Sequence, residues 1–104
     1  MREKIEDALL QMGISPSRKG FGFIVDAVEL LANNDLCNGM GGTYEIIAEA
    51  RETTYGAVER GIRYAIAKAS RESDWWIKMG LSQRVTNGKF LSALALLIKR
   101  ESQK

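Results

Sequence analysis

The sequence predicts an all-α fold without a sheet, organised around a helix-turn-helix. Apolar residues recur at intervals of three and four along most of the chain, which is the spacing of amphipathic helices. Two of these segments are joined by only a few residues around Thr53, so their helices must cross steeply. The dipeptides Asn38-Gly39 and Asn87-Gly88 are common in hairpins, but no alternating apolar residues flank them.

The first two predicted helices span residues 2–12 and about 17–33. In the first helix the apolar residues with helical spacing are Ile5, Ala8, Leu9 and Met12. Gly13 is expected to end this helix, and Pro16 biases the residue before it away from a helical conformation. In the second helix the expected core residues are Ile24, Val25, Val28, Leu31 and Ala32, with Phe21 and Phe23 near its start.

Gly20 and Gly22 weaken the start of the second helix, by about 1 kcal/mol each relative to Ala. Close packing would explain them, as would a DNA backbone nearby with Lys19 beside a phosphate; a frayed helix start is the alternative. Residues 33–42 are expected to form the main loop. Its glycines do not make a phosphate-binding loop, because no Lys-Ser or Lys-Thr pair follows and no strand precedes.

Residues 43–51 predict the first helix of the helix-turn-helix, with Thr43 as its N-cap. Its apolar groups at helical spacing are Tyr44, Ile47, Ala48 and the stem of Arg51. Ala48 supplies the small residue required where two steeply crossing helices touch. Glu52 occupies a position where such turns often have Gly or Asn, so the turn is expected to be strained or slightly longer.

The second helix of the helix-turn-helix begins near residue 55. When successive residues are placed about 100° apart around its axis, it has two contrasting sides. Its core side contains Val58, Ile62, Ala65, Ile66 and Ala69. The opposite side contains Gly56, Arg60, Arg63, Ala67 and Arg71, with Tyr64 at its margin. Thr53 or Thr54 can cap this helix, and arginine donors match a phosphate or the edge of guanine. The helix suits the major groove of DNA, although an ordinary solvated face is the alternative for this helix alone.

The last helix is expected from residue 89 to about residue 102, with Asn87 as its cap. Its apolar face contains Phe90, Ala93, Leu94, Leu97 and Ile98, flanked by Leu91 and Leu96. This face is expected to pack on the second helix of the chain, and a dimer contact is the alternative. Of the adjacent Trp75 and Trp76, one is expected in the core and the other exposed for a partner.

Several of these residues occur together in a known family. They are Tyr44, Ile47, Ala48, Thr53, Thr54, Val58, Glu59, Arg60, Ile62, Arg63, Ala65 and Ile66, with further matches at Gly13-Ile14, Lys19-Gly20-Phe21, Phe23, Ala27-Val28, Thr86-Asn87 and Phe90. On these residues the chain resembles the C-terminal DNA-binding effector domain of the stage-zero sporulation response regulator of endospore-forming bacteria, over roughly residues 9 to 100. The resemblance implies about six helices and a transcription factor that binds short promoter boxes.

The resemblance also implies which residues meet DNA. Glu59, Arg60 and Arg63 match the groove-facing residues of the family, and Arg84 matches a cation that contacts phosphate. The residues that depart from the pattern are Gly56 and Ala57 in place of a polar or basic pair, Tyr64 in place of a His, and Val85 in place of a Pro. Base preference is therefore expected to differ. Residues 74–80 are more aromatic than in the family, where this region helps to contact RNA polymerase; the implied partner is the sigma subunit.

The charge of the chain is unevenly distributed. Its net charge of +2 is too small to indicate nucleic-acid binding by itself. Residues 1–50 carry four cations and eight anions, whereas residues 51–104 carry eleven cations and five anions. The excess lies in the predicted recognition helix and in the last segment, as an electrostatic footprint for DNA would.

Other function classes lack the residues that they need. The chain has one Cys and no His, so we expect no zinc site, no cofactor and no enzyme activity. It has no signal peptide and no apolar run of about 18 residues, so we expect no membrane segment and a cytoplasmic location. We expect residues 1–104 to form a single helix-turn-helix effector-type domain without a receiver domain, either excised or free-standing; Met1 followed directly by helical sequence favours the second.

The leading hypothesis is sequence-specific binding of double-stranded DNA at promoter boxes, with two copies or a homodimer on tandem sites. The residues expected to contact DNA are Thr54, Tyr55, Gly56, Glu59, Arg60, Arg63, Tyr64, Arg84 and Lys89. The alternative hypothesis is a protein-interaction module that kept the fold and lost specific DNA binding. It is suggested by Gly56, Ala57 and Tyr64, and by the two adjacent tryptophans.

Overall fold

Six α-helices and no strand form the described part of the chain, which comprises residues 1–33, 39–81 and 85–102 of this computed structural model. The helices are α1 (Arg2–Gln11), α2 (Lys19–Asn33), α3 (Gly39–Ala50), α4 (Tyr55–Ala67), α5 (Asp74–Met79) and α6 (Asn87–Ser102). The predicted all-α fold is confirmed. None of these helices is long and apolar enough to cross a membrane.

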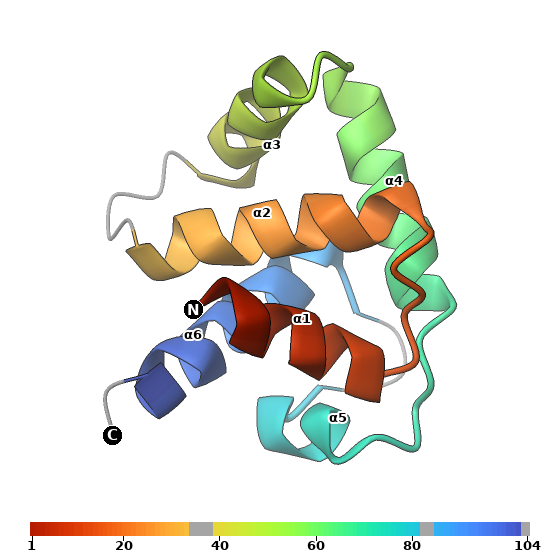
Figure 1. Ribbon diagram of the computed structural model, residues 1–104, viewed down its shortest axis with the longest axis vertical. Helices are drawn as coiled ribbons and strands as arrows, with labels where there is room; N and C mark the ends of the chain where they lie inside the picture. Colours follow the sequence, from red (N-terminus) through yellow and green to blue (C-terminus); the bar gives the residue numbers. More distant parts are fainter. Residues whose placement is uncertain (34–38, 82–84, 103–104) are drawn as a thin grey trace.

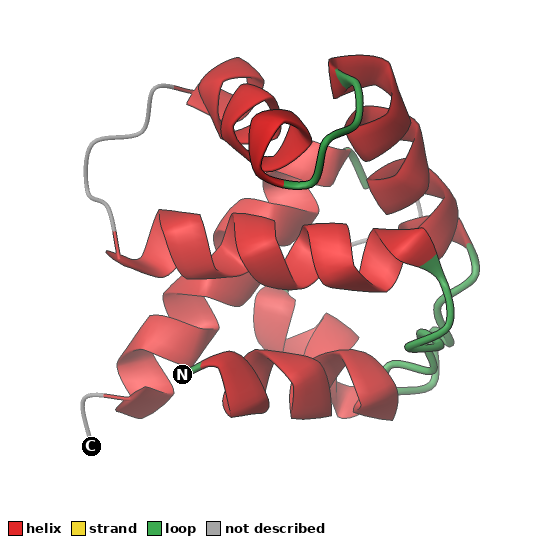
Figure 2. Cartoon of the chain, turned by 45° about the horizontal axis from the view of Figure 1, so that its top comes forward, coloured by secondary structure: helices red, strands yellow, loops and turns green. Residues whose placement is uncertain are grey.

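Helix α2 lies at the centre of the molecule and the other helices surround it (Figure 1). It packs against α1, α3, α4 and α6. Its buried residues are Gly20, Phe21, Phe23, Ile24, Val25, Ala27, Val28 and Ala32. The predicted core residues of α2 are confirmed, except that Leu31 is only partly buried. Helix α3 and the start of α4 lie on the opposite side of α2 from α1 (Figure 2).

Helices α2 and α4 cross with their backbones in contact, because two glycines meet at the crossing. A Cβ atom on Gly20 would lie 2.2 Å from the carbonyl oxygen of Gly61, and a Cβ atom on Gly61 would lie 2.9 Å from the ring of Phe23. A side chain at Gly20 would therefore push the helices apart. Close packing explains this glycine, and because it is buried against α4, neither an exposed backbone near DNA nor a frayed helix start applies to it.

A residue of positive φ follows three of the helices within two positions of the last helical residue. Helix α1 is followed by Gly13 (φ 79°) and α5 by Gly80 (φ 66°), but α3 is followed by Glu52 (φ 53°). After α3 the Thr53 N–H donates to the Ala48 carbonyl at 2.8 Å, which closes the turn. The predicted strain at Glu52 is confirmed, because a left-handed conformation costs a residue with a side chain roughly 1–2 kcal/mol.

Helix α3 begins earlier than predicted, at Gly39. Thr43 therefore lies inside the helix, where it is buried, and its predicted role as N-cap is wrong. The glycines of residues 39–42 predict a loop because each disfavours a helix by about 1 kcal/mol, but the packing of α3 on α2 and α4 outweighs this preference. Residues 34–38 of the predicted loop lie outside the described residues. Helix α2 begins at Lys19, two residues later than predicted.

Helix α6 is capped by a different residue than predicted. The Lys89 N–H donates to the Thr86 hydroxyl at 3.2 Å, so Thr86 and not Asn87 caps the helix. The buried face of α6 is also rotated: its buried residues are Phe90, Leu91, Leu94, Ala95 and Ile98, whereas Ala93 and Leu97 are only partly buried. The predicted packing of this helix on α2 is confirmed.

Both tryptophans of α5 are buried, so the expectation that one of them is exposed is wrong. The Trp75 Nε1–H donates to Gln11 Oε1 at 2.8 Å, and the Trp76 Nε1–H donates to the Ser70 carbonyl at 2.6 Å. The guanidinium of Arg71 stacks on Trp76, with its Cζ 4.0 Å from the ring centroid. The indoles thus fix α5 to the core instead of serving a partner.

We expect Gly20→Ala to lower the free energy of unfolding by up to about 2 kcal/mol, because overpacking costs about 1–3 kcal/mol and the helix-propensity gain of about 1 kcal/mol offsets only part of this cost. Urea denaturation followed by circular dichroism measures the change. Gly22→Ala is the matched control in the same helix. Its Cβ would meet the end of the Arg51 side chain, at 3.0 Å from Nη1, instead of a backbone atom of another helix, so a smaller loss is expected. A Gly20→Ala variant as stable as the wild type would contradict the backbone contact.

We expect Glu52→Gly to raise the free energy of unfolding by about 1 kcal/mol, because Gly adopts positive φ without the cost that a side chain has there. Glu52→Ala removes the same carboxylate but keeps a Cβ, so its stability should stay close to that of the wild type. Thermal unfolding of the three proteins provides the comparison. If both substitutions stabilise equally, charge and not backbone conformation is responsible.

Candidate nucleic-acid interface

Helices α3 and α4 form the predicted helix-turn-helix. They diverge from the short turn of residues 51–54 (Figure 1) and pack directly on each other. The rings of Tyr44 and Tyr55 meet edge to face, with centroids 5.4 Å apart and planes inclined at 71°. This contact fixes the start of α4 against α3 and leaves Tyr55 45% exposed.

An ionic network ties the turn to α2. The Arg51 Nε donates to Asp26 Oδ2, and Arg2 of α1 reaches the other oxygen of Asp26 at 3.2 Å. The hydrogen bond from Arg51 to Asp26 raises the pKa of Arg51. The charge of Arg51 is therefore used to hold the turn in place.

Thr54 caps the start of α4, as one of the two predicted caps. Its backbone is extended (φ −105°, ψ 157°), and its hydroxyl accepts a hydrogen bond from the Ala57 N–H at 3.1 Å. The N–H groups of a first helical turn carry partial positive charge, which favours an anion close to them. Gly56 presents no side chain in this turn.

The two sides of α4 differ as predicted. Its buried residues are Val58, Ile62, Ala65 and Ile66. On the opposite side, Arg60, Arg63 and Tyr64 are exposed and Glu59 is partly buried. We call these last four residues the outer face of α4. No large aliphatic side chain is exposed on this helix.

Contacts within the outer face orient its charged groups. Glu59 Oε1 and Arg63 Nη1, one turn apart, form an ion pair at 3.3 Å. The Cζ atom of Arg63 lies 5.5 Å from the ring centroid of Tyr64. Arg60 reaches back along the helix over Gly56, where a Cβ atom would lie 3.0 Å from its Nη1. The two arginines therefore have different neighbours: Arg60 lies over Gly56, and Arg63 pairs with Glu59.

Asn87, at the start of α6, connects three helices behind the outer face. Its Nδ2 donates to the backbone carbonyl of Glu59 at 3.1 Å. Its side chain also hydrogen-bonds with Tyr44 of α3, and burial raises the pKa of Tyr44. Helices α3, α4 and α6 are thus held together, and Thr86 and Lys89 are exposed at the start of α6.

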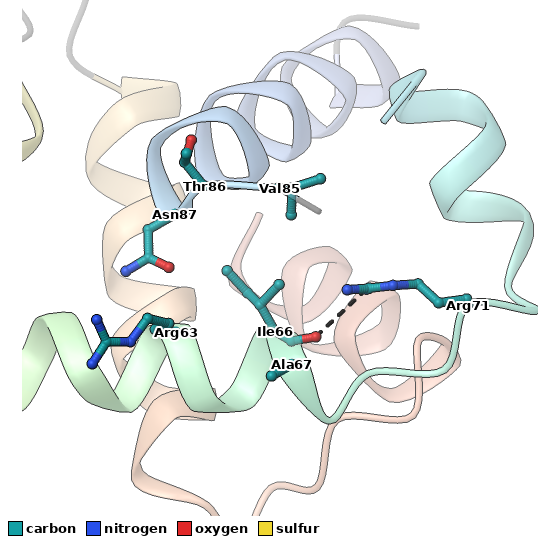
Figure 3. A pocket seen from close by; sticks show the side chains of 7 residues that line it. All are labelled: Arg63, Ile66, Ala67, Arg71, Val85, Thr86 and Asn87. Carbon is teal, nitrogen blue, oxygen red and sulfur yellow. Dashed lines mark hydrogen bonds between the residues drawn. The ribbon is translucent and has the colours of Figure 1, made fainter. Parts of the chain in front are cut away.

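A groove runs between α4 and the start of α6. One part is a pocket of about 330 Å³ lined by Arg63, Ile66, Ala67, Arg71, Val85, Thr86 and Asn87 (Figure 3). The adjoining pocket, of about 420 Å³, shares Arg63, Val85, Thr86 and Asn87 with it and extends to Tyr44, Glu59 and Gly88. We call the two pockets together the α4–α6 groove. Its guanidinium, hydroxyl and amide groups are of the kinds that bind phosphates and base edges.

Arg71 does not lie where helical spacing predicts. The helix ends at Ala67, with Lys68 as its C-cap, so residue 71 follows the helix instead of continuing its outward side. The spacing argument is wrong here because it extends the helix past its last turn. Arg71 Nη1 instead donates to the Ile66 carbonyl at 3.5 Å, at one end of the α4–α6 groove (Figure 3).

Eight of the nine predicted DNA-contact residues belong to the described part of the chain. Those on α4 or at its start are Thr54, Tyr55, Gly56, Glu59, Arg60, Arg63 and Tyr64. Lys89 lies in the first turn of α6, and Arg84 lies outside the described residues. Sequence reasoning assigns Asn87 to a helix cap and misses its link to α4; the match of Thr86-Asn87 to the known family is a signal that could have drawn attention to it.

Comparison with known proteins gives one match. The sequence matches the family described as "Sporulation initiation factor Spo0A C terminal" over residues 5–98. This range contains α2 to α5 and most of α1 and α6. No curated protein and no solved structure matches the chain.

We expect the stabilising effect of Tyr44 to depend on pH. Because its pKa is raised in the folded protein, its protonated form stabilises the fold below pH about 10, and this contribution is lost as the pH rises through the raised pKa. Near neutral pH the wild type should exceed Tyr44→Phe in stability by about 1 kcal/mol, the value of a hydrogen bond. Urea denaturation over a pH series should show this difference vanishing at alkaline pH. A constant difference would contradict the burial of an ionisable hydroxyl at this position.

Proposed function

The chain belongs to the family of C-terminal domains of the sporulation initiation factor Spo0A, and we propose that it binds specific sequences in double-stranded promoter DNA through the outer face of α4. The family is one of DNA-binding transcription regulators of sporulation. The observation that carries the proposal is the outer face itself, with two exposed arginines on the second helix of a helix-turn-helix.

Base recognition is assigned to three side chains. Arg60 and Arg63 can each donate two hydrogen bonds to O6 and N7 of guanine, and Glu59 can accept from N4 of cytosine. The ion pair between Glu59 and Arg63 supports this role, because it orients the donor and the acceptor, 3.3 Å from each other, before DNA arrives. Tyr64 flanks Arg63 and adds an aromatic surface at the margin.

Phosphate contacts are assigned to groups at the edges of the outer face. Thr54 and Tyr55 stand at the N-terminus of α4, where backbone N–H groups favour an anion, and Gly56 allows a close approach. Lys89 is exposed in the first turn of α6, and we include Arg84 on the family resemblance alone. These contacts position the protein but carry no sequence information.

Two kinds of protein partner complete the proposal. One recognition helix contacts only a few base pairs, so we propose two copies on tandem sites. We propose the sigma subunit of RNA polymerase as a second partner. On α5, the segment for which the resemblance implies that contact, Ile77 is 81% exposed and offers an apolar contact point.

The alternative of a protein-interaction module has lost part of its support, because Trp75 and Trp76 are buried. Selection of random duplexes, followed by affinity measurements at several salt concentrations, separates the two functions. DNA binding should give an enriched motif and a negative slope of log K against log salt. No motif and no slope would support the interaction module instead.

We expect Arg60→Ala to weaken binding to the selected duplex by about 1–3 kcal/mol and to relax preference at one base pair, because a bidentate base contact is lost. Fluorescence anisotropy with the selected duplex and its single-base variants measures both effects. Arg100→Ala is the control: it removes an exposed arginine near the other end of α6, and binding should be unchanged. Unchanged affinity and preference in a folded Arg60→Ala variant would remove Arg60 from the site.

A further inference from the structure

We infer that Arg71 binds a backbone phosphate of the bound duplex in the α4–α6 groove, outside the helix-turn-helix. The inference rests on the proposed DNA binding and assigns a phosphodiester to the part of the groove that Figure 3 shows. Arg71 follows the end of α4 by four positions, and the fold places it in the same pocket as Arg63 of the outer face.

The guanidinium of Arg71 is held in place before any ligand binds. Its Cζ lies 4.0 Å from the ring centroid of Trp76, and its Nη1 donates to the Ile66 carbonyl at 3.5 Å. Trp76 is itself fixed by burial and by its hydrogen bond to the Ser70 carbonyl. A guanidinium held by stacking loses less side-chain entropy when it binds an anion.

The pocket around Arg71 suits an anion. Thr86 contributes a hydroxyl to its lining and Arg63 a guanidinium whose charge is offset by Glu59, and none of the described residues that line this pocket is acidic. Apolar walls are supplied by Ile66, Ala67 and Val85. Low-dielectric walls strengthen the attraction between a cation and an anion. The nearest acidic residue of the outer face, Glu59, lines the adjoining pocket.

The position of the pocket along α4 fits the DNA backbone better than the bases. A recognition helix meets base edges through its N-terminal residues. From Arg60 to Ala67 the helix advances by about 10 Å, so a group beyond Ala67 lies well past the N-terminal residues that meet base edges. A group beyond Ala67 is therefore expected at the phosphates that border the groove.

The first test compares wild type, Arg71→Gln and Arg71→Lys for binding to the selected duplex at several salt concentrations. Loss of one phosphate contact should make the slope of log K against log salt less negative by about 0.9. Between about 0.1 M and about 1 M salt, the affinity of the wild type should therefore fall by a factor about eight times larger than that of Arg71→Gln. Arg71→Lys should keep the slope. The loss in Arg71→Gln should be equal on the selected duplex and on its single-base variants, because a phosphate carries no sequence information.

Lys68→Gln is the matched control. It removes one exposed cation directly after α4 but does not line the pocket, so the salt slope should stay at the wild-type value. Circular dichroism checks that each variant is folded.

Neutral methylphosphonates, introduced one at a time into the duplex, locate the contact. At one phosphate, replacement by a methylphosphonate should weaken binding of the wild type and leave the affinity of Arg71→Gln unchanged. If no phosphate is coupled to Arg71, or if Lys68→Gln changes the slope as much as Arg71→Gln does, the assignment of Arg71 is wrong while the DNA-binding function stands. If the wild type selects no motif and shows no salt slope, both are wrong.

Free phosphate shares the chemistry of a phosphodiester, so a separate titration distinguishes the two sources. The NMR signal of the Arg71 Nε–H is followed during addition of inorganic phosphate and, separately, of the selected duplex. We expect saturation with the duplex and only a weak, unsaturated shift with inorganic phosphate. Tight saturation by inorganic phosphate, without a response to DNA, would overturn the assignment in favour of a small phosphorylated ligand.

Discussion

The backbone contact between α2 and α4 at Gly20 and Gly61 is the constraint on which the rest of the structure depends. Helix α2 forms the centre of the core, and no side chain separates it from α4 at the crossing. This close approach fixes both the depth and the rotation of α4. The rotation in turn buries Val58 and Ile62 and leaves Arg60 and Arg63 outside. The position of the outer face is thus a consequence of how the core packs.

Polar and aromatic contacts then fasten α4 along its length. Its start is held by the contact between Tyr55 and Tyr44, and its middle by the hydrogen bond from Asn87 to the Glu59 carbonyl. Just beyond its last turn, Arg71 is held on Trp76. A surface fixed in this way needs little ordering when a ligand binds, which lowers the entropic cost of association.

Periodicity was sufficient to predict α1, α2, α4 and α6, because each buries one stripe of apolar residues against a single core. The short turn of the helix-turn-helix, and not periodicity, led to the expectation of a strained or slightly longer turn at Glu52, and the positive φ there shows the strain. Periodicity failed where distant contacts decide the outcome. Tertiary packing extends α3 through a glycine-rich start, and both indoles find hydrogen-bond acceptors outside α5. At the start of α6 a local contact was misassigned, because Thr86 and not Asn87 is the cap. Spacing alone does not reveal such partners, and the same limit misplaced Arg71.

The ion pair between Glu59 and Arg63 affects how such a domain would search a chromosome. Arg63 carries its own counter-charge, so the pair is neutral and adds little to the attraction that holds a protein on unrelated sequences. Its donors and acceptors form their full set of hydrogen bonds only where complementary base edges face them. If the chain binds DNA as proposed, the pair would therefore raise discrimination between target and competitor sites without lengthening the time spent on the competitors, which outnumber the targets in any genome.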